Sequence, residues 1–325
     1  MNRPLDLKRI GYYLAFAFGI SWTTALIIYL RGGIHDSPII LPAIGYTEAL
    51  LLISTTYMFA PAIAHVLTRL VTREGWRDTG LRPNFKRGWR YWLLAWLGTL
   101  VLILLGAAVF FAIFPRHFDT NLAQVVANIR TLEEQTGQPF PLPPSAFLIV
   151  LIIQSMTVAL LFNFIPILGE EFGWRGYLQP KLMPLGTRKA MLWMGLIWGV
   201  WHWPLIAMGH AYGSEYVGAP WLGLLTFAWF TFVLGTFLGW LTLRSGSVWP
   251  AVIGHTVNNV IALGIVPLVL VGSPNPLFGP SPAGLLGGIA FSIVALRLFL
   301  GRGLYPEAEE SPSESLEAVP EGIHA

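Results

Sequence analysis

The sequence predicts an all-α fold, a polytopic membrane bundle of about eight transmembrane helices with the N- and C-termini in the cytoplasm. First, 54% of the 325 residues are hydrophobic and only 11% are charged, whereas a soluble domain is about 25% charged. Second, the mean hydropathy is +0.61, and long apolar segments recur along the chain. Third, the basic residues gather in alternate loops between those segments.

A helix that crosses the hydrocarbon core needs about 20 mostly apolar residues. The segments that meet this requirement are 10–30, 40–71, 90–114, 146–169, 190–209, 221–243, 249–271 and 283–300. The first is longer than the roughly 7–15 apolar residues of a signal peptide, and no small-x-small cleavage pattern follows it. We therefore expect it to be the first transmembrane helix.

The orientation follows from the Lys and Arg residues, which favour cytoplasmic loops. The loop after the second predicted helix is strongly basic, whereas the loop between the fifth and sixth has no Lys or Arg. We expect an integral protein of the plasma (inner) membrane, with membrane lipids as partners. The basic residues lie at helix ends and not on one soluble face, so nucleic acid is not an expected partner.

We expect three parts along the chain. Residues 1–144 hold the first three transmembrane helices and an external loop with a short helix near 121–134, which Gly137 closes. Residues 145–304 form the membrane core that carries the chemistry. Residues 305–325 are rich in Glu, Ser and Pro, and this composition predicts a disordered acidic tail.

Ionisable side chains inside a bilayer are costly and are functional candidates by default. Glu170, His202 and His255 lie 11, 13 and 11 residues from the nearest basic residue at the cytoplasmic end of their helices. Continuous helix would place all three about 16–20 Å from that end. His65 lies near the cytoplasmic end of the second predicted helix, where we expect it to reach the interface.

Helical periodicity separates the roles of these groups. Glu171 and Arg175 are four residues apart and can form a structural pair on one side of the helix. Glu170 lies about 100° away around the helix, so it is left free to act as a base. His255 and Asn259 are also four residues apart and can point at one spot.

This set meets the needs of peptide hydrolysis without a covalent nucleophile. A carboxylate can activate water with a histidine assisting, and polar donors can stabilise an oxyanion. The chain has no cysteine and only four Asp, none deep in a span, which excludes a thiol nucleophile and an aspartyl dyad. Glu170, His202 and His255 could also ligate zinc, although the sequence has no H-E-x-x-H motif; metal dependence stays open.

Three motifs then resemble those of the CPBP family of intramembrane proteases, which includes the CAAX prenyl endoproteases and the Abi proteins. EEFGWR at 170–175 resembles E-E-x-x-x-R, WGVWH at 198–202 resembles F-x-x-x-H, and HTVNN at 255–259 resembles H-x-x-x-N. The resemblance covers about 145–270. Trp198 stands where the family pattern usually has Phe.

The resemblance implies a glutamate-dependent intramembrane endopeptidase of a kind often labelled metalloprotease. It implies that Glu170 and His202 activate water, that His255 and Asn259 form the oxyanion hole, and that Glu171 and Arg175 support them. The implied substrate is a membrane-associated peptide or lipidated protein, prenylated CAAX proteins among them, and the active site is expected to open toward the cytoplasm.

Two alternatives stay open. A non-enzymatic immunity or scaffold protein could retain the same motifs. A proton-coupled transporter could use the buried Glu and His residues as a relay, but it would be favoured by inverted repeats and paired broken helices, and the sequence shows neither.

Overall fold

The computed structural model describes residues 4–42 and 45–301, except the side chain of Arg87. The tail predicted at 305–325 lies outside the described residues. The α-helices are α1 (Leu7–Leu30), α2 (Glu48–Leu52), α3 (Ala60–Thr72), α4 (Phe85–Leu93), α5 (Thr99–Ile113), α6 (Ala123–Thr136), α7 (Pro144–Met156), α8 (Val158–Gly173), α9 (Gln179–Leu182), α10 (Thr187–Ala207), α11 (Trp221–Ser245), α12 (Trp249–Gly264) and α13 (Ile289–Leu300). The strands are β1 (Ile39–Leu41) and β2 (Tyr46–Thr47), which pair antiparallel.

The predicted helical membrane bundle is confirmed. Among the described residues, seven helical stretches are long and apolar enough to cross a membrane, namely Leu7–Leu30, Glu48–Thr72, Gly88–Ile113, Pro144–Leu185, Thr187–Ala207, Trp221–Ser245 and Trp249–Val269. The last expected span, 283–300, forms a helix only over its final 12 residues. Glycines occupy positions 284, 287 and 288, and glycine disfavours helix, so the regular helix begins after them.

Two further expected boundaries were wrong. The second helix was expected from residue 40, but β1 and β2 occupy 39–41 and 46–47, and the helix begins at Glu48. Pro42 and Gly45 interrupt this apolar stretch, and both residues favour a turn over a helix. The fourth helix was expected at 146–169, but helix runs on to Leu185 with a break at Thr157. The short helix expected near 121–134 is α6, and Gly137 ends it with φ 65°.

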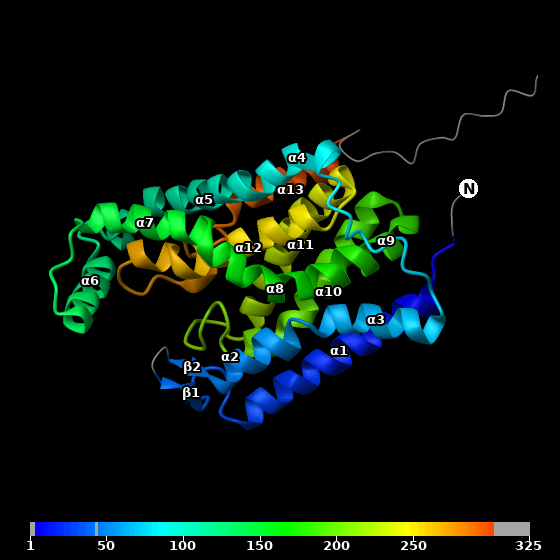
Figure 1. Ribbon diagram of the computed structural model, residues 1–325, viewed down its shortest axis with the longest axis horizontal. Coiled ribbons are helices and arrows are strands. Elements are labelled where there is room, and N and C mark those ends of the chain that lie inside the picture. Colours follow the sequence, from blue (N-terminus) through cyan, green and yellow to red (C-terminus); the bar gives the residue numbers. More distant parts are fainter. Residues whose placement is uncertain (1–3, 43–44, 302–325) are drawn as a thin grey trace, which may run out of the picture.

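The helices that carry the candidate residues lie in the middle of an elongated bundle (Figure 1). α8, α10 and α12 are flanked by α1 and α3 along one side and by α5 and α7 along the other. α10 packs most extensively against α11, and α8 packs against both α3 and α12. The membrane core therefore encloses the three motifs, while α6 lies at one tip of the bundle.

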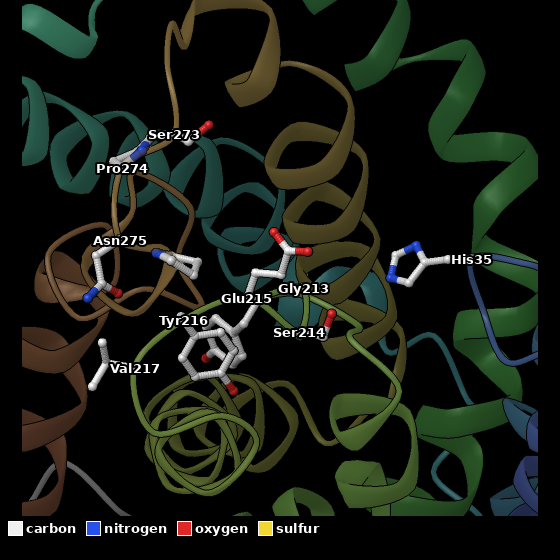
Figure 2. Close-up of a pocket in the computed structure, with 11 residues that line it drawn as sticks. His35, Gly213, Ser214, Glu215, Tyr216, Val217, Ser273, Pro274 and Asn275 are labelled. Atoms are coloured by element: carbon white, nitrogen blue, oxygen red, sulfur yellow. The ribbon is translucent and has the colours of Figure 1, made fainter.

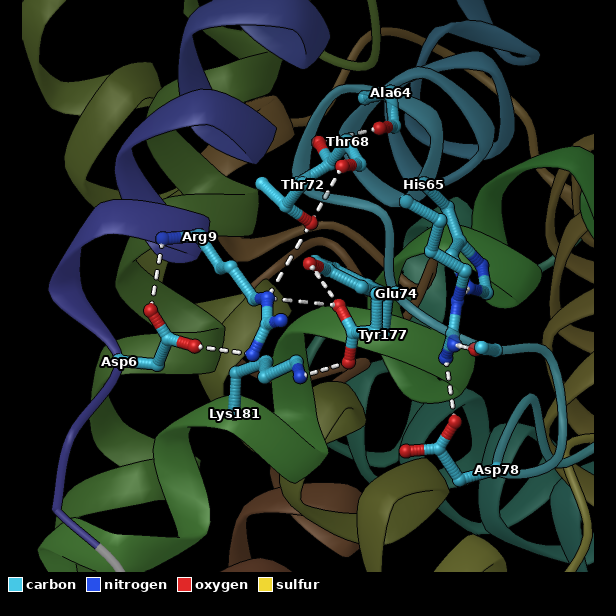
Figure 3. Close-up of polar contacts among 12 residues, drawn as sticks. Asp6, Arg9, Ala64, His65, Thr68, Thr72, Glu74, Asp78, Tyr177 and Lys181 are labelled. Atoms are coloured by element: carbon cyan, nitrogen blue, oxygen red, sulfur yellow. Dashed lines mark hydrogen bonds and ion pairs between the residues drawn. The ribbon is translucent and has the colours of Figure 1, made fainter.

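One end of the bundle is held by a polar group that we call the Glu74 cluster, formed by Asp6, Arg9, Glu74, Tyr177 and Lys181 (Figure 3). Glu74 accepts a hydrogen bond from Tyr177 at 3.0 Å and pairs with Arg9 at 3.3 Å. Lys181 pairs with the other oxygen of Glu74. The cluster joins the start of α1, the segment that follows α3 and the region of α9.

His65 is fully buried. The expectation that its side chain reaches the interface was therefore wrong. Its Nδ1 lies 2.9 Å from the carbonyl oxygen of Phe172, and its Nε2 accepts a hydrogen bond of 2.6 Å from Nε of Arg69. Because Arg69 must donate, the neutral tautomer with hydrogen on Nδ1 satisfies both contacts. His65 thus links α3 to the backbone of α8 next to Glu171.

Gly173 lets α8 approach α3. A Cβ atom added at Gly173 would lie 2.4 Å from backbone and side-chain atoms of Pro61, a distance that no folded protein tolerates without movement. The glycine of the EEFGWR motif is therefore explained by the closeness of two helices. A turn of π-helix, Trp174–Leu178, begins directly after it, and such turns are frequent at functional sites.

We predict that Gly173→Ala destabilises the protein by about 1–3 kcal/mol, because the added methyl group must displace α3 from α8. Thermal unfolding in detergent measures the loss. Gly19→Ala is the matched control, since it also adds a methyl group within a helix but meets no atom within 4 Å. Equal melting temperatures for the two variants would contradict this account of the packing.

Candidate active site

The motif residues come from three helices and differ in their exposure. Glu170 and Glu171 lie on α8 with 3% and 0% of their surface exposed, and His255 lies on α12 with 4% exposed. His202 on α10 and Asn259 on α12 keep part of their surface accessible. The carboxylates are thus enclosed, whereas His202 and Asn259 are each partly exposed.

Glu171 is the centre of a buried ionic link. Its Oε1 accepts a hydrogen bond of 3.0 Å from Nη1 of Arg175 and lies 2.8 Å from Nδ1 of His255. The expected pair between Glu171 and Arg175 is therefore present, and both side chains are 0% exposed. The contact to His255 was not expected. It joins α8 to α12 and orients the imidazole with Nδ1 toward the carboxylate.

Glu170 has a different partner. Its Oε2 accepts a hydrogen bond of 3.1 Å from Nε1 of Trp198 on α10. The two neighbouring carboxylates thus face different groups, as their angular separation on the helix predicts. Because Arg175 and His255 bond to Glu171, Glu170 is the carboxylate held only by a neutral donor.

Trp198 contacts several charged or titratable groups of the site besides Glu170. Its ring lies 4.6 Å from the guanidinium carbon of Arg175 and 5.1 Å from the ring of His255. Its carbonyl oxygen lies 2.9 Å from Nδ1 of His202. In the sequence Trp198 is simply an aromatic residue in place of Phe, but Phe could not donate to Glu170. The indole N–H was the signal that could have identified this role.

His202 is oriented by its own helix. A carbonyl oxygen can only accept, so Nδ1 carries hydrogen and donates to Trp198. In the neutral ring this leaves Nε2 as an acceptor. The rings of Trp201 and Phe227 lie 4.6 and 4.8 Å from the imidazole and fix its plane.

Asn259 is oriented by its neighbour. Nδ2 of Asn258 donates to Oδ1 of Asn259 at 3.1 Å, which leaves the amide nitrogen of Asn259 available as a donor. Neighbouring helical residues point about 100° apart, so helical periodicity does not predict this contact. Asn258 is 4% exposed.

The positions of the candidate ligand side chains show whether they could hold a zinc ion together. Within the ranges 4–42 and 45–301, no group of three or more His, Cys, Asp or Glu side chains is placed to hold a metal ion. Glu170, His202 and His255 therefore do not form the three-ligand set of a catalytic zinc site. We derive no step through a metal.

The fold and the site define a class: a polytopic membrane protein that buries two adjacent glutamates among histidine and asparagine side chains from separate helices. Residues 152–261 match the sequence model of the family described as type II CAAX prenyl endopeptidase Rce1-like. This range contains all three motifs. The expected resemblance to the CPBP family is therefore confirmed over this segment.

Among individual proteins, the chain is similar to CAAX prenyl protease 2 of Methanococcus maripaludis. The two are 31% identical over 109 residues, which cover 30% of this chain and 40% of the relative. The match thus spans less than half of either protein.

We predict that Arg175→Met destabilises the fold by about 3–5 kcal/mol, because it leaves the fully buried Glu171 carboxylate without its guanidinium. The control is Arg31→Met, which removes an ion pair of 3.0 Å to Glu48 in which Arg31 is 58% exposed. An exposed pair contributes little to stability, because water screens it. Similar unfolding temperatures for the two variants in detergent would show that the buried link does not hold the helices.

Proposed function

We propose that the protein is an intramembrane endopeptidase that hydrolyses a peptide bond in a membrane-associated, CAAX-type substrate. The observation that carries the proposal is that two adjacent buried carboxylates have different hydrogen-bond partners. Glu171 is held by Arg175 and His255, whereas Glu170 accepts one hydrogen bond from Trp198. A carboxylate without a cationic hydrogen-bond partner can accept a proton from water.

Glu170 would take a proton from a water molecule while the water oxygen bonds to the scissile carbonyl carbon. Nε2 of His202, left as an acceptor by the contact of Nδ1 to Trp198, would hold the second hydrogen of that water. The carbonyl oxygen then becomes an oxyanion. When the carbon–nitrogen bond breaks, Glu170 returns the proton to the leaving amine, so no covalent enzyme intermediate is needed.

The oxyanion needs donors that are fixed before the reaction. The amide nitrogen of Asn259 fits this role because Asn258 already donates to the amide oxygen. His255 is held through Nδ1 by Glu171, which directs Nε2 away from that carboxylate. On this assignment Asn258, Glu171 and Arg175 are positioning residues.

The substrate class rests on the comparisons. The family description names a prenyl endopeptidase and the similar archaeal protein is named a prenyl protease. A membrane-associated peptide suits a site on helices that cross the membrane. A prenyl group on that peptide and an active site that opens toward the cytoplasm are parts of the proposal.

We predict that Glu170→Gln lowers kcat for quenched-fluorescent peptides, prenylated and unprenylated, by at least about 100-fold, because glutamine cannot accept the proton. The variant should keep its unfolding temperature in detergent. Glu48→Gln is the control, since Glu48 is an ion-paired glutamate outside the site.

Full activity of Glu170→Gln would remove Glu170 from the mechanism. Cleavage by the wild type that survives a zinc chelator supports a glutamate-activated water, whereas loss with the chelator would point to a metal. No cleavage of any peptide by folded wild type would favour the non-enzymatic alternative.

We predict that Trp198→Phe lowers kcat/KM about 10- to 100-fold, because a hydrogen bond to a charged group contributes about 1.5–3 kcal/mol. Trp203→Phe is the matched control on the same helix. The indole nitrogen of Trp203 is buried and has no hydrogen-bond partner within the described part of the chain. Equal rates for both variants would show that the bond from Trp198 to Glu170 does not contribute.

A further inference from the structure

The end of the bundle that carries the Glu74 cluster has many exposed basic side chains. Most of them belong to the segment 73–90, which leads from α3 into α4. We call its described, exposed members the basic surface, namely Arg73, Arg77, Arg82, Lys86 and Arg90. None of them forms an ion pair with another described residue, so their mutual repulsion is uncompensated there.

The described carboxylates at this end are already paired. Asp6 and Glu74 pair with basic members of the Glu74 cluster (Figure 3). Asp78 pairs with Arg69 at 2.9 Å. These partners are all outside the basic surface. The basic surface therefore suits an anionic partner from outside the described residues.

The segment 73–90 is fixed across the ends of two helices. Nδ2 of Asn84 donates a hydrogen bond of 2.7 Å to the carbonyl oxygen of Gly246, which follows α11. The backbone N–H of Val248 donates to the carbonyl oxygen of Gly80 at 3.0 Å. The basic surface thus lies over the end of α11 and the start of α12.

The helix α13 ends close to the basic surface. α5 leads away from α4, whereas α13 packs on α5 and leads back toward α4 (Figure 1). A Cβ atom at Gly106 would overlap the carbonyl oxygen of Gly287. Leu93, which ends α4, and Leu300, which ends α13, each lie 13 residues from this contact, about 20 Å along their helices. The carbonyl oxygen of Leu300 also accepts a hydrogen bond of 3.2 Å from Arg188 at the start of α10.

The sequence that follows α13 is acidic. Residues 305–325, the acidic tail, contain six Glu and no Asp, Lys or Arg. A chain of this length reaches at most about 70 Å. The helix α1 has 24 residues and is about 36 Å long, so the tail is long enough to reach every part of the basic surface.

The opposite end of the bundle offers no comparable partner for an acidic segment. There the loops 208–220 and 270–276 and the side chain of His35 surround a cavity of about 670 Å³ (Figure 2). Its described lining includes Glu215 but no Lys or Arg. The charge of that cavity therefore disfavours the tail, whereas the basic surface matches it.

We propose that the acidic tail binds to the basic surface of the same molecule. An exposed ion pair contributes little by itself, so this binding uses several pairs at once, and the basic surface supplies five cations for six carboxylates. The tail begins beside its site, and such a tether gives an effective concentration that a free anion must exceed. The bound tail shields the basic surface from anionic lipid headgroups, which are attracted to the same kind of segment.

The absence of cysteine from the sequence allows a test on the full chain. In the variant Pro83→Cys with Ser313→Cys, a short bis-maleimide should join the two cysteines within one molecule. This reaction should be at least about 5-fold faster than in Gln138→Cys with Ser313→Cys, because Gln138 lies beyond α6 and Pro83 lies within the segment 73–90; both positions are exposed. Equal rates, or a product formed only between two molecules, would overturn the proposal.

The cross-link must also depend on charge on both sides. Arg77→Gln combined with Arg82→Gln and Lys86→Gln should slow it at least about 5-fold, and so should Glu→Gln at all six tail positions. The control, Arg116→Gln with Arg130→Gln, removes exposed basic residues elsewhere and should have no effect. Labelling of the same cysteines by a mono-maleimide corrects each rate for thiol reactivity. A rate that survives neutralisation of either partner would show that charge does not hold the tail.

Anionic lipid is the rival occupant of the basic surface. In nanodiscs of phosphatidylcholine the cross-link should form, and phosphatidylserine should slow it by no more than about 2-fold, because the tail is tethered beside its site. A fall to the rate of the Gln138 pair would assign the surface to lipid headgroups and overturn the proposal. The neutralised variants should keep the unfolding temperature of the wild type, which separates loss of binding from loss of the fold.

Discussion

The candidate site depends on the burial of the Glu171 carboxylate. A charged group that is removed from water needs well-placed ionic or hydrogen-bond partners. A lone ion in the protein interior costs several kcal/mol. Arg175 supplies this compensation from one turn further along the chain, and His255 supplies it from α12. Because both partners are needed at one oxygen, the positions of α8 and α12 relative to each other are fixed. The same requirement holds the imidazole of His255 in one orientation.

The surroundings of Glu170 follow from that arrangement. With Arg175 bonded to Glu171, the neighbouring carboxylate meets the indole of Trp198, whose face also covers the guanidinium. One aromatic side chain thus orders a carboxylate, a cation and, through its carbonyl oxygen, His202. The small residues around it complete the arrangement, since Gly173 lets α3 approach and Gly195 lets α11 approach α10. Site geometry and helix packing are therefore set by the same contacts.

The sequence predicted the parts of this site that depend on local periodicity. The pair between Glu171 and Arg175 follows from a spacing of four residues, and the separate faces of Glu170 and Glu171 follow from the helical angle. The contact from His255 to Glu171 joins residues 84 apart in the chain. Helical periodicity cannot predict a contact between residues so far apart in sequence. His65 was placed at the interface for the same reason, because its burial depends on a contact with Phe172, 107 residues further along the chain. The predicted starts of the second and eighth helices were wrong because Gly or Pro interrupts the apolar sequence there. Hydrophobicity alone does not distinguish a helix from an apolar loop.

The position of His202 along α10 places this side chain near one end of the bundle. His202 lies five residues before the end of α10 at Ala207, about 8 Å along the helix axis, whereas the start of α10 lies about three times farther away. Its accessible side is therefore closer to the loop 208–220 than to the basic end of the helix.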